Sequence, residues 1–267
     1  MAKYKSYVGV TETADPGLHW KSLKKLHRSN VIITKHLEND EFKEWLLEHQ
    51  NCIILHATIT GWGGTDVEPG VQPWDEQLEH LMKLISMGFN PKHVVLRVDP
   101  IIPTSDGFSR AIEVIHKYAL LYDNEANRGP VRVRTSMIDC YYHIRRKLKN
   151  VGIDTSLITN DKGFTVKEEL FHKLNDYICI LRKDYPHLEF EACTEKMLTS
   201  CEQIGCVSQK DIDILGLTDV VKLEGKTHQR QGCLCPNNKI QLTGTYWDIA
   251  KQKCESKCAY CYLKSNH

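Results

Sequence analysis

The sequence predicts an α/β fold whose parallel sheet closes, fully or partly, into a TIM-like barrel. Short β-branched apolar runs alternate with segments of helical period, which is typical of repeated strand–helix units. Six to eight such units fit a chain of 267 residues. No G-x-G-x-x-G follows a strand, and the glycines at 61, 63 and 64 are expected to end a strand in a turn. A dinucleotide-binding open sheet is therefore disfavoured.

Each expected element rests on its local pattern. The expected strands cover residues 6–11, 30–36, 52–60, 93–99, 131–138, 188–193, 219–223 and 240–246. The expected helices cover residues 74–87, 108–122, 166–185 and 208–215. A helix between successive strands returns the chain to the same end of the sheet, so the strands should run parallel.

Composition limits the function classes. With 41% hydrophobic and 26% charged residues, the chain can bury a core as one compact unit. The net charge of +1 argues against binding a polyanion over the whole surface. No apolar run is long enough for a membrane span, and the first residues lack a signal peptide's apolar stretch. The expected compartment is the cytoplasm, with no membrane partner.

Polar residues gather where the expected strands end. They are Thr58, Thr60, Arg97, Asp99, Ser136, Asp139, Glu191 and Glu195. In a parallel barrel these ends form one rim, on which active sites are built. As a group they predict a polar pocket, and the alternative is that each only begins a solvated loop.

Cysteine is the most informative residue type. The chain has eleven, and in a cytoplasmic protein metal binding is a better explanation than disulfides. Eight of them lie between residues 193 and 261. Cys254-x-x-x-Cys258-x-x-Cys261 places three thiols in one short loop, whereas a saturated 4Fe-4S cluster takes four. Three ligands would leave one iron open, as catalytic zinc sites keep an exchangeable position.

This spacing, with Tyr260 before the last cysteine, resembles the C-x-x-x-C-x-aromatic-C signature of the radical SAM superfamily. The run CAYCYL is similar to the cluster loop of spore photoproduct lyase. The loop stands near the C-terminus rather than after the first strand, as in a circularly permuted arrangement. The chain also resembles a bacterial family of unknown function with such a C-terminal cluster, in blocks at 31–36, 58–69, 96–100, 136–146, 191–195 and 231–235. It departs from that family in lacking paired N-terminal arginines and in residues 236–253.

The resemblance implies two units: a barrel body, residues 1–230, and a cysteine-rich segment, residues 231–267, which completes the barrel and carries the cluster loop. It implies a 4Fe-4S cluster on Cys254, Cys258 and Cys261 that binds S-adenosylmethionine, cleaves it reductively and yields a 5'-deoxyadenosyl radical. A reductase such as flavodoxin or ferredoxin would supply the electron. Tyr260 is expected near the adenine. Contacts to S-adenosylmethionine or substrate are expected from Thr58, Lys35, Arg97, Asp99 and Glu195, unless these residues serve only to support the structure.

Four further cysteines match the ligand count of an auxiliary 4Fe-4S cluster: Cys193, Cys206, Cys233 and Cys235. Cys201 could replace Cys206, and some of the four could be ordinary buried thiols. The other inorganic alternative is a zinc ribbon formed by Cys233, Cys235, Cys258 and Cys261.

Two basic segments bear on the substrate. Residues 221–267 carry eight Lys or Arg against three acids, and residues 128–149 carry seven against one. Together they favour phosphate contacts and a nucleobase, nucleotide or nucleic-acid substrate, unless they are solvated faces. Cys140 is a candidate hydrogen donor to a substrate radical, or simply a packed thiol. The alternative to an enzyme is a non-catalytic binding module whose fold is stabilised by zinc or an iron–sulfur cluster.

Overall fold

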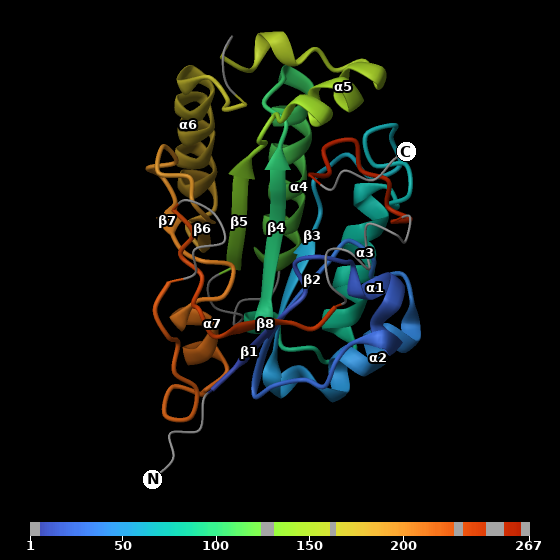
Figure 1. Cartoon of the computed structure of the whole chain (residues 1–267), viewed down its shortest axis with the longest axis vertical. Helices are drawn as coiled ribbons and strands as arrows, with labels where there is room; N and C mark the ends of the chain where they lie inside the picture. Colours follow the sequence, from blue (N-terminus) through green and yellow to red (C-terminus); the bar gives the residue numbers. More distant parts are fainter. Residues whose placement is uncertain (1–5, 124–130, 161–163, 227–231, 244–253, 263–267) are drawn as a thin grey trace.

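The fold is a single eight-stranded sheet in which every pair of neighbouring strands is parallel (Figure 1). The computed structural model describes residues 6–123, 131–160, 164–226, 232–243 and 254–262. The strands are β1 (Val8–Val10), β2 (Ser29–Thr34), β3 (Ile53–Thr58), β4 (Val94–Ile101), β5 (Val131–Met137), β6 (Leu188–Ala192), β7 (Glu202–Gln203) and β8 (Lys239–Gln241).

Strands β1 to β7 lie side by side in chain order, and β8 pairs with β1 at the opposite edge from β7, which gives the order β7-β6-β5-β4-β3-β2-β1-β8. From β1 to β7 the chain therefore adds each strand on the same side of the one before it. The parallel α/β expectation is confirmed. Among the described residues β7 and β8 each pair on one side only, so the sheet has two edges instead of a closed ring of hydrogen-bonded strands.

Helices connect the strands. The α-helices are α1 (Pro16–His19), α2 (Asp40–Glu48), α3 (Trp74–Ser86), α4 (Ser105–Asp123), α5 (Tyr142–Asn150), α6 (Glu168–Asp184) and α7 (Gln209–Ile214), and the 3-10 turns are η1 (Trp20–Ser22), η2 (Gln50–Cys52), η3 (Pro91–His93) and η4 (Thr155–Leu157). Side chains cap several of them: Asn39 accepts from the Phe42 amide, and Ser208 and Asp211 form a capping box on α7. None of the described helices is long and apolar enough to cross a bilayer.

Alternation along the strands separates two apolar clusters. On β3, Ile53, Leu55 and Ala57 belong to the large cluster that includes residues of α2 to α6, whereas Ile54 belongs to a small cluster on the other face, to which α7 contributes. His56 follows Ile54 on that second face and is fully buried. The second face thus changes from apolar to polar side chains towards the carboxyl ends of the strands.

Several elements differ from the sequence-based expectation. Residues 219–223 form no strand, because Val221 packs its side chain into the small cluster while its amide bonds to Leu217. The two-residue β7 supplies the next strand instead, and it is too short and exposed for any pattern to predict. Helices α2 and α5 escaped prediction because charged residues dominate both.

The last expected strand, 240–246, is reduced to β8, which pairs with β1. The cysteine-rich segment therefore contributes a strand to the sheet. Residues 244–246 lie outside the described part of the chain.

Candidate functional site

The C-terminal loop, residues 254–262, is docked onto the loop that follows β3; Figure 1 shows it in red beside that loop. The Ala259 amide donates to the Val67 carbonyl at 2.8 Å, and the Gly70 amide donates to the Ser256 carbonyl at 3.3 Å. These backbone bonds place the tail at the carboxyl end of the sheet, where parallel α/β folds build their sites.

The docking depends on a close approach at Gly70. A Cβ there would lie 1.8 Å from the carbonyl oxygen of Glu255, so only glycine fits. A side-chain contact adds to it: the His36 ring lies between Glu38, 2.9 Å from Nδ1, and Ser256, 2.8 Å from Nε2. These contacts hold together segments that are more than 180 residues apart in the sequence.

A buried ion pair lies beneath the tail loop. Lys35, the residue after β2, places Nζ 2.8 Å from Oε1 of Glu68, whose side chain has no exposed surface. Burial acts to lower the pKa of Lys35, but Glu68 and then the Cys258 thiol outweigh it and raise that pKa overall. Lys35 is thus a cation beside Cys258.

The three tail thiols are electrostatic neighbours. Burial, Glu68, Cys261 and Cys254 together raise the pKa of Cys258, and Lys35 only partly opposes them. Their sulfurs are not all within 4.8 Å of one another, since no group of that tightness among the described residues contains them. A single tetrahedral ion needs sulfurs about 3.8 Å apart, so the tail is wider than a zinc site.

Near this ion pair lie several buried polar atoms that have no hydrogen-bond partner among the described residues. They are Thr58 Oγ1, Gln77 Oε1, Tyr260 Oη and the second carboxylate oxygen of Glu68. The Lys35 ammonium lies 5.5 Å from the centre of the Tyr260 ring. Buried polar groups normally find hydrogen-bond partners. Four buried polar atoms without hydrogen-bond partners in one place indicate a site that can bind a polar ligand.

Two of the expected contact residues form one unit further along the rim. Arg97 donates from Nε to Asp99 Oδ2 at 2.7 Å, and Ser136 also bonds to Asp99. Burial acts to lower the pKa of Arg97, whereas Asp99 and Cys206 raise it overall. Arg97 is therefore a permanent cation facing the second cysteine group described below.

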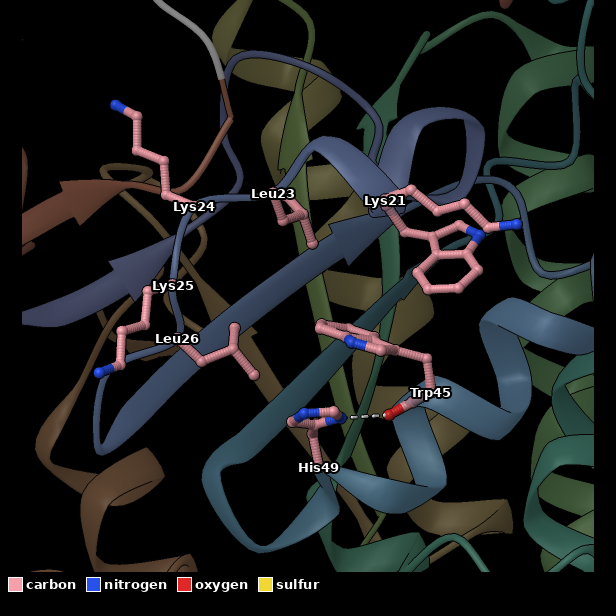
Figure 2. Close-up of a pocket in the computed structure, with 8 residues that line it drawn as sticks. Lys21, Leu23, Lys24, Lys25, Leu26, Trp45 and His49 are labelled. Atoms are coloured by element: carbon pink, nitrogen blue, oxygen red, sulfur yellow. Dashed lines mark hydrogen bonds between the residues drawn. The ribbon is translucent and has the colours of Figure 1, made fainter.

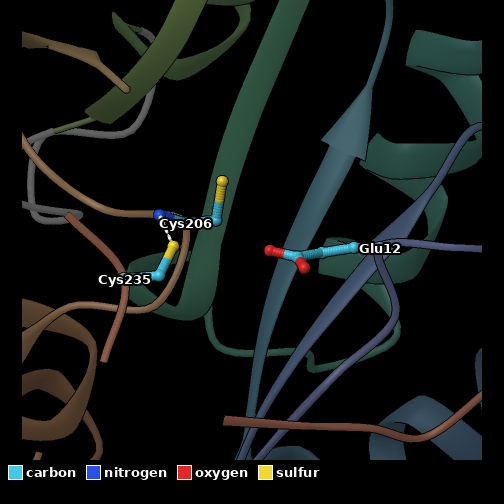
Figure 3. Close-up of side chains that lie close together, drawn as sticks. All are labelled: Glu12, Cys206 and Cys235. Atoms are coloured by element: carbon cyan, nitrogen blue, oxygen red, sulfur yellow. Dashed lines mark hydrogen bonds between the residues drawn. The ribbon is translucent and has the colours of Figure 1, made fainter. Parts of the chain in front are cut away.

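A second group of thiols lies near the other end of the rim (Figure 3). Cys206 and Cys235 have their sulfurs within 4.8 Å of each other and of a Glu12 carboxylate oxygen. Cys193 interacts with both thiols. Neither Cys193 nor Cys233 is part of the mutually close set.

Other cysteines are placed elsewhere. Cys201 is buried in the large apolar cluster, where burial raises its pKa to about 12, so it does not stand in for Cys206. Cys235 lies with the second group and Cys258 with the tail, so the four sulfurs of the expected zinc ribbon are divided between two places.

Cys140 is buried in the large apolar cluster, and burial raises its pKa to about 11. Its amide donates to Phe164 and its carbonyl accepts from Arg145. This placement favours the packing alternative over the hydrogen donor. Glu195 is half-buried in the loop after β6, and its carbonyl accepts from Gln203.

The expected basic surface is partly wrong. Arg132 and Arg134 are buried, because their side chains turn into the interior of the fold and pair with Glu191. Arg132 also contacts Asp211 at 2.9 Å. The arginines of β5 are therefore structural, and within the 128–149 segment the exposed cations that remain in the described structure lie on α5.

A surface pocket of about 570 Å³ lies between η1, the loop after it and α2 (Figure 2). It is lined by Trp20, Lys21, Leu23, Lys24, Lys25, Leu26, Trp45 and His49. No cysteine and no expected site residue lines it. The chemistry-bearing residues instead gather where the tail and the rim meet.

Sequence reasoning missed Glu12 and Glu68. Glu12 immediately follows an expected strand, so the strand-end rule that selected Thr58 would also have found it. Glu68 lies in a loop ten residues after β3, and only the folded loop brings it to Lys35. His56, hidden mid-strand, is missed because nothing in an apolar run marks a residue facing a polar interior.

The fold and site define an α/β protein with one parallel sheet and cysteine groups at its carboxyl-end rim. A family model described as "Domain of unknown function (DUF1848)" matches residues 24–263, and the chain belongs to that family. No curated protein and no solved structure matches the chain.

Proposed function

We propose that this chain is a radical SAM enzyme whose 4Fe-4S cluster is held by Cys254, Cys258 and Cys261. One observation carries the proposal: Cys258 lies against the Lys35–Glu68 pair, next to buried polar atoms that lack partners. The three thiols fit a cluster with one open iron, since they share a loop and are spaced more widely than a single ion requires.

The surrounding residues fit a polar, zwitterionic cofactor. Lys35 offers a cation and Glu68 Oε2 a free acceptor, which complement the carboxylate and amino groups of S-adenosylmethionine. Thr58 and Tyr260 offer unpaired hydroxyls within the same site. When bound, the reduced cluster would supply the electron for reductive cleavage of S-adenosylmethionine, and flavodoxin or ferredoxin are the proposed donors.

His56, which lies deeper in the fold, is a further candidate to contact the bound ligand. Burial, together with Arg134 and Arg97, lowers its pKa well below the usual value, so the ring is neutral. Both ring nitrogens lack a protein partner among the described residues. A neutral imidazole offers one donor and one acceptor, which suits a ligand without net charge at that point.

The proposed substrate class is a nucleobase or nucleotide, free or within a nucleic acid. Helix α5 lies beside the end of the tail, because His143 Nε2 is 3.1 Å from the Tyr262 carbonyl oxygen. Tyr141 stacks on Phe164 with ring centres 4.8 Å apart, and Tyr142 is 84% exposed. Exposed rings next to the cations of α5 provide the combination that binds stacked bases and phosphates.

Anaerobic reconstitution tests the proposal. Protein loaded with iron and sulfide should be brown and should form 5'-deoxyadenosine from S-adenosylmethionine and dithionite. Cys258→Ala should abolish this product, whereas Cys179→Ala, at an exposed thiol on α6, should not. A colourless zinc protein that leaves S-adenosylmethionine intact would support the rival metal-stapled binding module instead. Nucleosides and oligonucleotides can then be screened for mass changes that require S-adenosylmethionine.

A further inference from the structure

The second cysteine group is assembled from four separate segments of the chain. Cys193 follows β6, Cys206 follows β7, Cys235 precedes β8, and Glu12 follows β1. Because β7 and β8 are the two edges of the sheet, the group spans the gap between those edges. Figure 3 shows Cys206 and Cys235 adjacent to each other, with the Glu12 carboxylate directed towards them.

The backbone is shaped to bring these segments together. A Cβ on Gly205 would lie 2.9 Å from the Cys235 nitrogen, so glycine lets the two loops touch. The Cys206 amide donates to the Cys235 sulfur at 3.2 Å, a bond typical of a thiolate acceptor. Thr194, next to Cys193, adopts φ 64°, a conformation that costs free energy in a residue with a side chain.

Charges around the thiols are already arranged for anionic sulfur. Lys239 and Arg97 are both influenced by the charge of Cys206. Lys239 Nζ lies 2.7 Å from both carboxylate oxygens of Glu12, and Gln241 Nε2 donates to Oε2 at 2.9 Å, so these two residues orient the carboxylate towards the thiols.

We propose that Cys193, Cys206, Cys235 and Glu12 bind a single tetrahedral metal ion, zinc or iron(II), that links the two edges of the sheet. The ligand spacing distinguishes this from the auxiliary cluster. Sulfurs around one tetrahedral ion are about 3.8 Å apart, and those around a 4Fe-4S cube roughly 6 Å. Cys206, Cys235 and Glu12 offer ligand atoms within 4.8 Å of one another, and Cys193, although it is outside this set as Cys233 is, interacts with both thiols.

The test uses full-length protein in which Cys254, Cys258 and Cys261 are replaced by alanine, so the tail cannot contribute. Anaerobic titration of the metal-free protein with cobalt(II) should give one ion per chain, with the intense visible bands of a tetrahedral thiolate site. Cys206→Ser and Cys235→Ser should abolish these bands. Glu12→Gln should weaken binding at least about tenfold and shift them. Cys179→Ser is the matched control and should change nothing.

Zinc X-ray absorption spectroscopy on the same full-length protein, in which the three tail cysteines are alanine, identifies the ligand atoms. Three sulfurs at about 2.3 Å and one oxygen at about 2.0 Å are expected. Four sulfurs would overturn the role of Glu12. Uptake of about four iron and four sulfide that depends on Cys233 would overturn the single ion, as would a folded protein that binds no cobalt. Because the tail ligands are absent, none of these failures bears on cleavage of S-adenosylmethionine.

Discussion

Lys35 Nζ lies 2.8 Å from Glu68 Oε1, and this pair joins the end of β2 to the loop after β3, on which the cysteine tail is docked. Removing one partner of a buried pair leaves the other charge uncompensated. Lys35→Met should therefore lower the free energy of unfolding by about 3 kcal/mol, measured by urea denaturation of the metal-free protein. The double variant Lys35→Met/Glu68→Gln should recover most of the loss, and a single variant as stable as the parent would contradict the interpretation.

Glu191 makes stability depend on acid pH. Burial acts to raise its pKa, but Arg134 and Arg132 lower it from the usual 4.5 to about 2. The folded pKa is the lower one, so the stabilisation is complete above the unfolded value and is lost as pH falls from about 5 to about 2. Its size is of the order of 3 kcal/mol. Denaturation between these pH values should show a steep loss of the free energy of unfolding in the parent protein. Glu191→Gln should flatten this pH dependence, whereas Glu202→Gln, at an exposed site, should leave it unchanged. Equal pH dependence in all three proteins would refute the role of Glu191.

Gly70 holds the tail at the rim. Gly70→Ala would place a methyl group 1.8 Å from the Glu255 carbonyl, so the tail must shift outwards. Alkylation of Cys258 in metal-free protein, followed by peptide mass mapping, should become at least about tenfold faster, because the thiol loses its cover. Gly88→Ala adds backbone strain at φ 108° without any contact and should leave the rate unchanged.

A substitution at Tyr260 should affect ligand binding without lowering the stability of the protein. Its hydroxyl is buried and has no hydrogen-bond partner in the described structure. Tyr260→Phe should leave the free energy of unfolding unchanged, or raise it by up to about 1 kcal/mol, because an unsatisfied group is removed. If the hydroxyl binds S-adenosylmethionine, the dissociation constant should rise about tenfold, measured by calorimetry on reconstituted protein. Unchanged affinity would remove Tyr260 from the site.

Cys140 is expected to act through packing. Cys140→Ala should lower the free energy of unfolding by about 1 kcal/mol, because a buried sulfur leaves a small void. Formation of 5'-deoxyadenosine should persist. Once a substrate is known, product formation that stops while cleavage of S-adenosylmethionine continues would restore the hydrogen-donor hypothesis.

The sequence by itself determined the local features of this protein. Alternating β-branched runs and amphipathic segments predicted a parallel α/β sheet, since each pattern reflects burial of one strand or one helix. The spacing around Cys258 predicted a metal loop, because its thiols are neighbours in the chain. Strand ends predicted a polar rim, and Lys35, Thr58 and Arg97 lie there.

Tertiary structure decided everything that depends on contacts between distant segments. It placed Glu68 under Cys258, turned Arg132 and Arg134 inwards, and brought Glu12 to Cys206 across almost 200 residues. It also left the sheet with edges at β7 and β8. The physical reason is that periodicity records whether a side chain is buried, whereas its partner is set by how strands pair and loops meet.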